Sequence, residues 1–324
     1  MCVSLHPAKF SGTIVGTFDA AGFRYLAYSN VAASLAGPAS TASTAGTRSG
    51  AATRSRLRSL PAARSIAPRR TASDWDVPAE GGGDSGAGNG NALILPIPDD
   101  FRNIDVIDTT AFGDFVSDIQ RALTPITRGR LRRGAAVDSM AKNVRIIEFD
   151  IYTIVISPSA EAIEKALAKL PANRRPVLNA KVLSKYTPWY RGWALAVCCF
   201  DNREAKRGKP LLFKYKPSKQ KDASKMFIPT LDDHSGNGPD LNEQVDVDHT
   251  IFAAAPGMVG GHAVAYTNPA GGHAAQRDLP AAVVGETLTG KYKNGDIIVD
   301  RNALLRDGTF KWHRVSPPDA PKTR

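Results

Sequence analysis

The sequence predicts an α+β fold with a mainly antiparallel sheet and two or three packed helices, interrupted by a disordered insertion. Strand-like stretches come before and after helix-like ones, without the regular β-α alternation of a parallel sheet. Apolar residues make up 42% of the 324-residue chain, which is enough for a substantial core. Residues 31–90 contain few large apolar side chains and form the predicted interruption.

The first thirty residues predict a hairpin or two consecutive strands. Strand-forming residues occupy Phe10–Phe18, a turn follows at Ala20–Gly22, and Phe23–Tyr28 returns. Residues 1–30 and 91–255 are expected to form one domain, because neither segment alone has enough apolar residues for a core.

Residues 31–90 are rich in Ala, Ser, Gly and Arg and are predicted to be a disordered insertion, since little apolar burial offsets the entropy of ordering. The stretch 31–70 carries seven arginines and no acid. One interpretation is an electrostatic arm for nucleic acid, with Arg54, Arg56 and Arg58 as contact residues. The alternative is a solvated loop without a partner, because no aromatic side chain lies among these arginines to stack on bases.

The region after the insertion begins with a strand and a helix. Asn91–Pro98 is a short apolar run whose prolines suit an edge strand. Thr109 or Thr110 then caps an amphipathic helix, because apolar residues recur at helical spacing at Phe112, Phe115, Val116, Ile119 and Leu123. In Val144–Ile156, apolar and polar residues alternate and this alternation is interrupted, which indicates a strand or a strand pair.

Two more helices and two strands are expected further on. Pro158 begins a helix that extends to about Leu170, and residues 177–190 predict a third, shorter helix. The continuous apolar run Trp193–Phe200 is typical of a central strand, and Leu211–Tyr215 is the next strand. Residues 256–324 are loosely patterned and are expected to be a loosely structured C-terminal appendage with one hairpin near its end.

Charge and cysteine content limit the partners and the compartment. The net charge of +11 favours polyanions as partners, and a second basic zone around Lys214 and Lys216 adds candidate nucleic-acid contacts.

Three cysteines imply no disulfide framework, and Cys198 and Cys199 are expected in the core. The absence of a long apolar run predicts a protein without a membrane span and a cytoplasmic location. The oligomeric state is not predicted.

Cys2 is the first candidate for chemistry. Removal of the initiator methionine would leave an N-terminal cysteine, whose α-amine titrates at about 8 and lies beside the thiol. This Met-Cys start, followed closely by a strand, resembles the N-terminal-nucleophile hydrolases, in particular their amidotransferase and cysteine-amidohydrolase branches. The resemblance covers the first thirty residues. It implies catalytic roles for Asp19 and Arg24. In the amidohydrolases an arginine follows the cysteine and an aspartate comes after it, whereas here Asp19 comes before Arg24.

Further catalytic candidates follow from this resemblance and from one polar strand end. The family uses an asparagine in its oxyanion hole, for which Asn30, Asn91 and Asn202 are candidates. Arg203, next to Asn202 at the end of a predicted strand, could clamp a carboxylate or phosphate through two hydrogen bonds. The implied substrate is a small molecule with an amide bond, and no cofactor is required.

The acidic stretch 227–252 is the second candidate. It holds carboxylates and imidazoles of the kind that bind a divalent metal, at Asp232, His234, Asp246, Asp248 and His249. In a strand, however, Asp246 and Asp248 share one face and His249 lies on the other. The alternative is therefore a polar turn whose acids pair with the preceding lysines. The stretch is also similar to one in bacterial proteins of unknown function.

Three functions follow from these features. The first is an N-terminal-cysteine hydrolase that acts on an amide bond. The alternatives are a nucleic-acid or polyanion-binding protein, and a metal-dependent hydrolase centred on the loop 232–249.

Overall fold

The computed structural model describes residues 10–32, 90–124, 136–141, 144–176, 180–201, 203–205, 208–220, 222–233, 238–268 and 274–319. These residues belong to a single compact unit. The predicted insertion, apart from its first two residues and its last, lies outside the described residues, as do Cys2, Asn202 and His234.

The fold is α+β, as predicted, and its largest sheet has seven strands. From one edge to the other they are β12 (His262–Ala263), β13 (Ala282–Lys293), β11 (Gln244–Ala254), β1 (Phe10–Ala20), β2 (Phe23–Ala32), β9 (Leu211–Tyr215) and β4 (Asp105–Val106). Neighbouring strands are antiparallel except β1 and β11, which are parallel.

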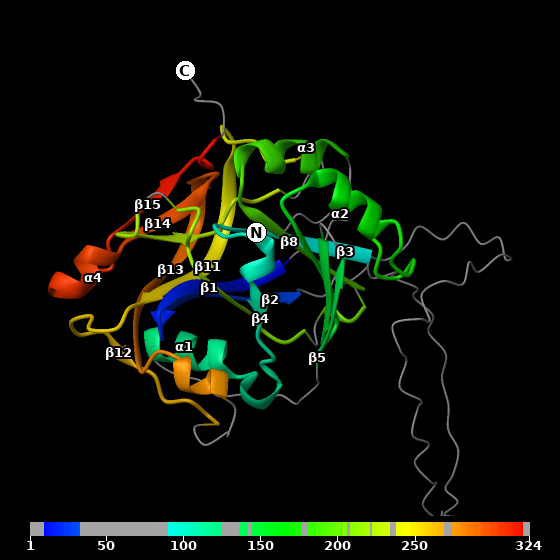
Figure 1. Cartoon of the computed structure of the whole chain (residues 1–324). Coiled ribbons are helices and arrows are strands. Elements are labelled where there is room, and N and C mark those ends of the chain that lie inside the picture. Colours follow the sequence, from blue (N-terminus) through cyan, green and yellow to red (C-terminus); the bar gives the residue numbers. More distant parts are fainter. Residues whose placement is uncertain are drawn as a thin grey trace, which may run out of the picture. The chain divides into compact units, whose positions relative to one another are not determined.

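The other described strands form two smaller antiparallel sheets (Figure 1). The five-stranded sheet has the order β3 (Gly90–Ile97), β8 (Ala194–Asp201), β7 (Tyr152–Ser157), β6 (Val144–Phe149) and β5 (Ala136–Ala141). The three-stranded sheet has the order β10 (Lys225–Ile228), β14 (Asp296–Asp300) and β15 (Trp312–Val315). The stretch 144–156 is thus a strand pair, divided by a turn at Asp150 with φ 53°.

The described helices are α1 (Phe115–Leu123), α2 (Ala160–Leu167), α3 (Ala180–Trp189) and α4 (Arg301–Asp307). Short 3-10 turns occur at Phe101–Asn103, Thr110–Phe112 and Ala274–Asp278. Helix α2 begins after Ser159, whose Oγ accepts a hydrogen bond from the backbone N–H of Ala162. None of the helices in the described part of the chain has the length and apolar character needed to span a bilayer.

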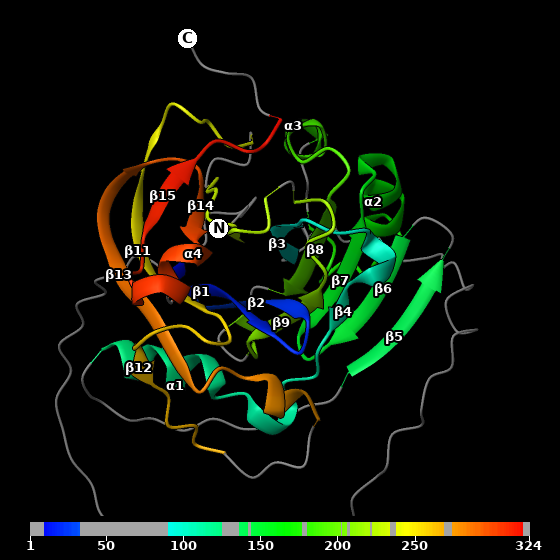
Figure 2. The same cartoon turned by 60° about the vertical axis from the view of Figure 1, so that its left-hand side comes forward.

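The core forms in layers, because each sheet has two apolar faces (Figure 2). One face of the seven-stranded sheet packs against α1 through residues such as Phe18, Phe115 and Phe252. Its other face packs on the five-stranded and three-stranded sheets. The outer face of the five-stranded sheet packs against α2 and α3. Cys198 and Cys199 are fully buried on opposite faces of β8, as expected for core residues.

The C-terminal segment differs from our expectation. Residues 256–324 were expected to be an appendage, but β13 pairs with β11 over ten positions within the main sheet, and β14 pairs with β10. Gly285 makes this close approach possible, since a Cβ there would lie 2.2 Å from the carbonyl oxygen of Ile251. The end of the chain therefore contributes to the core of the same unit.

Candidate functional site

The N-terminal end of β1 is the part of the described fold nearest to Cys2 in sequence. Gly12 adopts a left-handed conformation, with φ 66°, where the pairing of β1 with β2 shifts register. Its backbone N–H donates to Oδ2 of Asp248 at 2.7 Å. Asn30 lies on β2 beside the same shift, and its Nδ2 donates to the Tyr28 hydroxyl at 3.1 Å. By strand alternation, Asp248 and Asn30 belong to opposite faces of the sheet.

Asp19 and Arg24 meet at the other end of β1. They are opposite each other across the β1–β2 pair, with Arg24 Nε 2.8 Å from Asp19 Oδ1. Arg24 Nη1 donates to Gln220 Oε1 at 3.1 Å and to the carbonyl oxygen of Lys225 at 2.8 Å. Arg301 Nε donates to the second carboxylate oxygen of Asp19 at 2.8 Å. This cluster therefore fastens β10 and α4 to the first hairpin.

The catalytic roles of Asp19 and Arg24 remain a prediction, and the geometry limits them. All three guanidinium nitrogens of Arg24 already have partners, and its side chain is only 3% exposed. Nine residues of strand separate Phe10 from Asp19, a distance of about 30 Å. The eight residues from Cys2 to Phe10 span at most about 28 Å, so Cys2 could approach Asp19 only if they extended back along β1.

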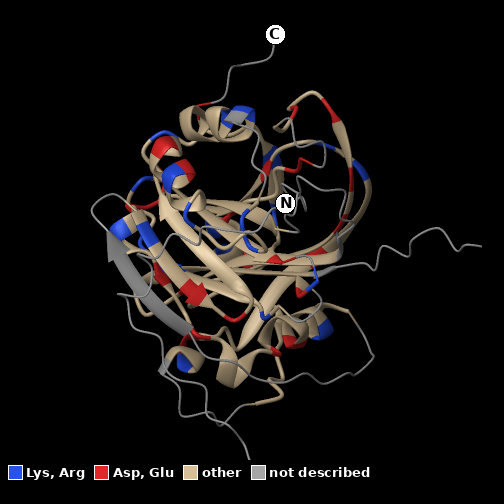
Figure 3. Cartoon of the chain, turned by 90° about the vertical axis from the view of Figure 1, so that its right-hand side faces the viewer, with Lys and Arg blue, Asp and Glu red and all other residues tan. Residues whose placement is uncertain are grey.

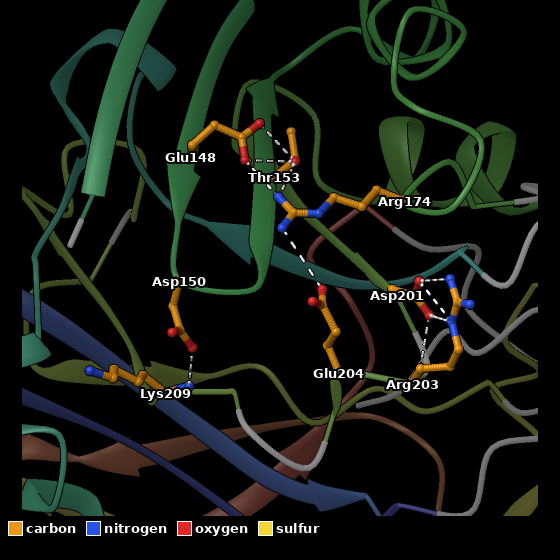
Figure 4. A network of polar contacts seen from close by, with 8 residues as sticks. All are labelled: Glu148, Asp150, Thr153, Arg174, Asp201, Arg203, Glu204 and Lys209. Atoms are coloured by element: carbon orange, nitrogen blue, oxygen red, sulfur yellow. Dashed lines mark hydrogen bonds and ion pairs between the residues drawn. The ribbon is translucent and has the colours of Figure 1, made fainter. Parts of the chain in front are cut away.

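A polar network lies at the end of β8 and at the β6–β7 turn (Figure 4). Arg174 donates to Glu148 Oε2 at 2.9 Å, and its Nη2 lies 3.8 Å from Glu204 Oε2. Thr153 Oγ1 donates to the Glu148 carboxylate, with its oxygens at 2.8 and 3.0 Å. Beyond the turn, Asp150 Oδ2 accepts from the backbone N–H of Lys209 at 2.8 Å.

Arg203 is held beside this network by Asp201. Its Nη2 lies 2.6 Å from Asp201 Oδ2, and its Nε donates to both carboxylate oxygens. The Arg203 side chain is 68% exposed, whereas that of Asp201 is 3% exposed. The hydrogen bonds from Arg203 hold the pKa of Asp201 below its usual value. Asp201 thus holds the Arg203 guanidinium at the surface of the protein, and Nη1 of Arg203 makes no hydrogen bond with Asp201.

The acidic residues of 227–252 do not form a metal centre within the described residues, where no group of three potential ligands occurs. Asp233 Oδ2 accepts from the backbone N–H of Gly238 at 2.8 Å. Asp246 and Asp248 are exposed on β11, while His249 is buried on its opposite face. Because His234 lies outside the described residues, the metal site stays a prediction.

A buried polar cluster, which was not expected from the sequence, holds part of the stretch 227–252 through hydrogen bonds. The Asn294 side chain accepts from the backbone N–H of Asp232 at 2.9 Å and donates to the carbonyl oxygens of Asp232 and Asp240 at 2.7 and 3.1 Å. Asp296 lies two residues further on and is fully buried. The Asn294-Gly295 pair is a turn signal that could have identified the break between β13 and β14, although these two strands belong to different sheets.

The predicted basic contacts divide between described and undescribed residues. Arg54, Arg56 and Arg58 lie outside the described residues. Lys214 and Lys216 place their ammonium groups 4.2 and 5.4 Å from the centroid of the Phe23 ring. In the view of Figure 3, positive and negative positions are interspersed over the described ribbon.

Known proteins give little guidance on function. No family model matches the chain, and no curated protein matches it. Among solved structures, the chain is similar to the 2.7 Å crystal structure of a mutated baculovirus P35 after caspase cleavage. That match has a TM-score of 0.36 and 10% sequence identity, and covers 95% of each chain. A TM-score this low does not establish a common fold and assigns no function.

Proposed function

We propose that the protein is an N-terminal-cysteine hydrolase that acts on an amide bond, with Cys2 as nucleophile. The observation that carries this proposal is the position of β1, a central strand between β11 and β2 that begins eight residues after Cys2. A strand paired on both sides gives the N-terminal segment a rigid attachment. The α-amine and the thiol of one residue supply base and nucleophile together.

Polar groups at the start of β1 support the proposal. Asp248 and Asn30 lie at that end of the sheet on opposite faces, and each is within the reach of an eight-residue segment. On one face the Asp248 carboxylate can hold the α-amine or the substrate. On the other face the Asn30 side-chain N–H can stabilise an oxyanion, so a single site would use one of the two. Arg203 is the candidate clamp for a substrate carboxylate, because its guanidinium is fixed by Asp201 and faces solvent.

The test compares the reactivity of the three thiols. Burial raises the pKa of Cys198 and Cys199 above the usual thiol value, so these thiols are expected to react slowly. Intact mass should show loss of Met1, and an iodoacetamide probe should label Cys2 well before the other two. Cys2→Ser should retain the fold and lose most hydrolysis across a panel of amide substrates.

The matched control inserts one alanine between Met1 and Cys2. It keeps the thiol but moves the α-amine away from it, so hydrolysis should be lost as fully as in Cys2→Ser. Retention of Met1, or labelling of Cys2 no faster than of Cys198, would overturn the proposal.

We infer polyanion binding as a second candidate function, favoured by the contact of Lys214 and Lys216 with Phe23. The two ammonium groups over this ring gather positive charge at one place on the surface, which can contact phosphates. The Lys214→Gln/Lys216→Gln variant should weaken DNA binding at 50 mM salt and reduce the salt slope by about 2, as expected for two lost phosphate contacts. Binding that does not respond to salt would exclude this function.

A further inference from the structure

A groove with a volume of about 330 Å³ lies between helix α2 and strand β6. Helix α2 packs there on the outer face of the five-stranded sheet, over β6 and β7 (Figure 2). The apolar part of the groove comes from Val144 and Ile146 of β6 and from Ala162 and Ala166 of α2. Small-molecule sites in proteins start at about 300 Å³, so the groove is large enough for a small ligand.

Small side chains on one side of α2 leave this groove open. The larger apolar residues of the helix, Ile163 and Leu167, are buried in the core against the sheet. Ala162 and Ala166 lie about one helical turn apart and carry only methyl groups, so they do not fill the space beside β6. The two β6 residues that line the groove are consequently only half-buried, and their apolar side chains are open to a ligand.

Charged residues lie along the rim of the groove. Glu161, Lys165 and Lys169 follow one another at intervals of four residues, and all three line the groove. Lys165 Nζ lies 2.6 Å from Glu161 Oε1, so these two charges balance each other. Lys169 forms no ion pair within the described part of the chain. The end of the groove at Lys169 therefore attracts an anion, whereas Glu161 repels an anion from the other end.

We propose that the groove binds a monocarboxylate with an unbranched apolar chain of about eight to ten carbons, whose length matches the rise of about 10 Å from Ala162 to Lys169. The chain lies on Val144 and Ile146, where burial of apolar surface drives binding. The carboxylate pairs with Lys169, which sets the orientation of the ligand. The site includes neither Cys2 nor Arg203 and is independent of the proposed hydrolysis.

NMR titration of the full-length protein with octanoate and decanoate gives the first test. The methyl signals of Val144, Ile146 and Ala162 should shift with either ligand, whereas those of Val299, in the three-stranded sheet, should not. Each buried methylene is expected to raise the affinity about fourfold, so decanoate should bind up to about 15-fold more tightly than octanoate. No shift of the three signals with millimolar decanoate would overturn the proposal.

Ala162→Leu tests where the apolar chain lies. Leucine is a good helix former, and its side chain would occupy the groove in place of the ligand. The variant should keep the wild-type Tm and bind decanoate at least about tenfold more weakly, which corresponds to the loss of about two buried methylenes. Equal decanoate affinity in the variant and the wild type would refute the assignment of the groove.

Lys169→Gln tests the position of the carboxylate, and it serves even if Ala162→Leu destabilises the protein, because Lys169 is exposed. Its decanoate affinity should fall about two- to fivefold at low salt, as expected for one exposed charge pair, and the difference should shrink at high salt. Decanol, which has the same chain without the charge, should bind this variant and the wild type equally.

The matched control is Lys311→Gln, which removes an exposed lysine just before β15 and should leave decanoate binding unchanged. An unchanged decanoate affinity in Lys169→Gln, or an equal loss of decanol binding, would refute the pairing of the carboxylate with Lys169.

Discussion

Replacement of Arg24 by methionine separates a structural role from a catalytic one. Methionine keeps the length and the apolar stem of the side chain but removes the guanidinium. The change leaves Asp19 with Arg301 as its partner and removes the donors to Gln220 and to the carbonyl oxygen of Lys225. The hydrophobic contacts of β2 are retained.

The expected loss of stability is large because the pair is buried. Breaking a buried ion pair by removal of one partner typically costs about 3–5 kcal/mol. Asp19 is 17% exposed and keeps its contact with Arg301, so we expect Arg24→Met to lower the free energy of unfolding by about 3 kcal/mol.

The measurement is equilibrium unfolding in urea, with the midpoint and the slope compared between variants. Arg102→Met is the matched control, because it also removes an arginine paired with an aspartate but both side chains are more exposed, and its loss should be much smaller. A loss below about 1 kcal/mol for Arg24→Met, or a larger loss for Arg102→Met, would refute this reasoning. A loss of hydrolysis in Arg24→Met supports a catalytic role only if it exceeds the loss expected from the lower stability of this variant.

Three further predictions concern packing and local hydrogen bonds. Gly16→Ala should lower the free energy of unfolding by about 1–3 kcal/mol, because its Cβ would lie 2.3 Å from Cδ1 of Phe252. A second substitution, Phe252→Leu, should restore part of the lost Tm. A double variant with no higher Tm than Gly16→Ala would contradict the clash. Asn294→Ala should cost about 1–3 kcal/mol and expose the Asp232 amide to hydrogen exchange, since it removes three hydrogen bonds, two of which are buried; unchanged exchange would count against this. Ser159→Ala should cost about 1 kcal/mol by loss of the α2 cap, measured as a Tm shift, whereas Ser159→Asp should retain stability.

Local patterns predicted much of the fold. Helix α1 buries Phe115, Val116 and Ile119 on one face, as their helical spacing indicates, since this periodicity is a property of the segment itself. The turn at Ala21 and Gly22 forms with positive φ at both residues, and the continuous apolar run in β8 is buried on both faces.

Long-range pairing was not predictable in the same way. Strand β13 is exposed along most of its second half, so its pattern lacks a regular apolar alternation. It forms because it pairs with β11, more than thirty residues away, and no local signal identifies that partner. The anchoring roles of Asn294 and Asp296 depend on the same pairing, because Asn294 lies in the turn that follows β13 and Asp296 begins β14 directly after it. Their burial could not be predicted once the C-terminal segment was expected to be loose.

The first hairpin shows why nearness of two candidate residues is weak evidence for catalysis. A tight turn at Ala21 and Gly22 places Asp19 opposite Arg24 whatever their function, since cross-strand neighbours must meet. What distinguishes a site is unused hydrogen-bonding capacity. Arg24 makes four hydrogen bonds with its five N–H groups, whereas Arg203 keeps Nη1 outside its pair with Asp201. An amide hydrolase built on Cys2 needs no second base, because its own α-amine serves. If Cys2 is the nucleophile, its substrate contacts are therefore expected near the start of β1 and at Arg203, whose Nη1 is not used by Asp201.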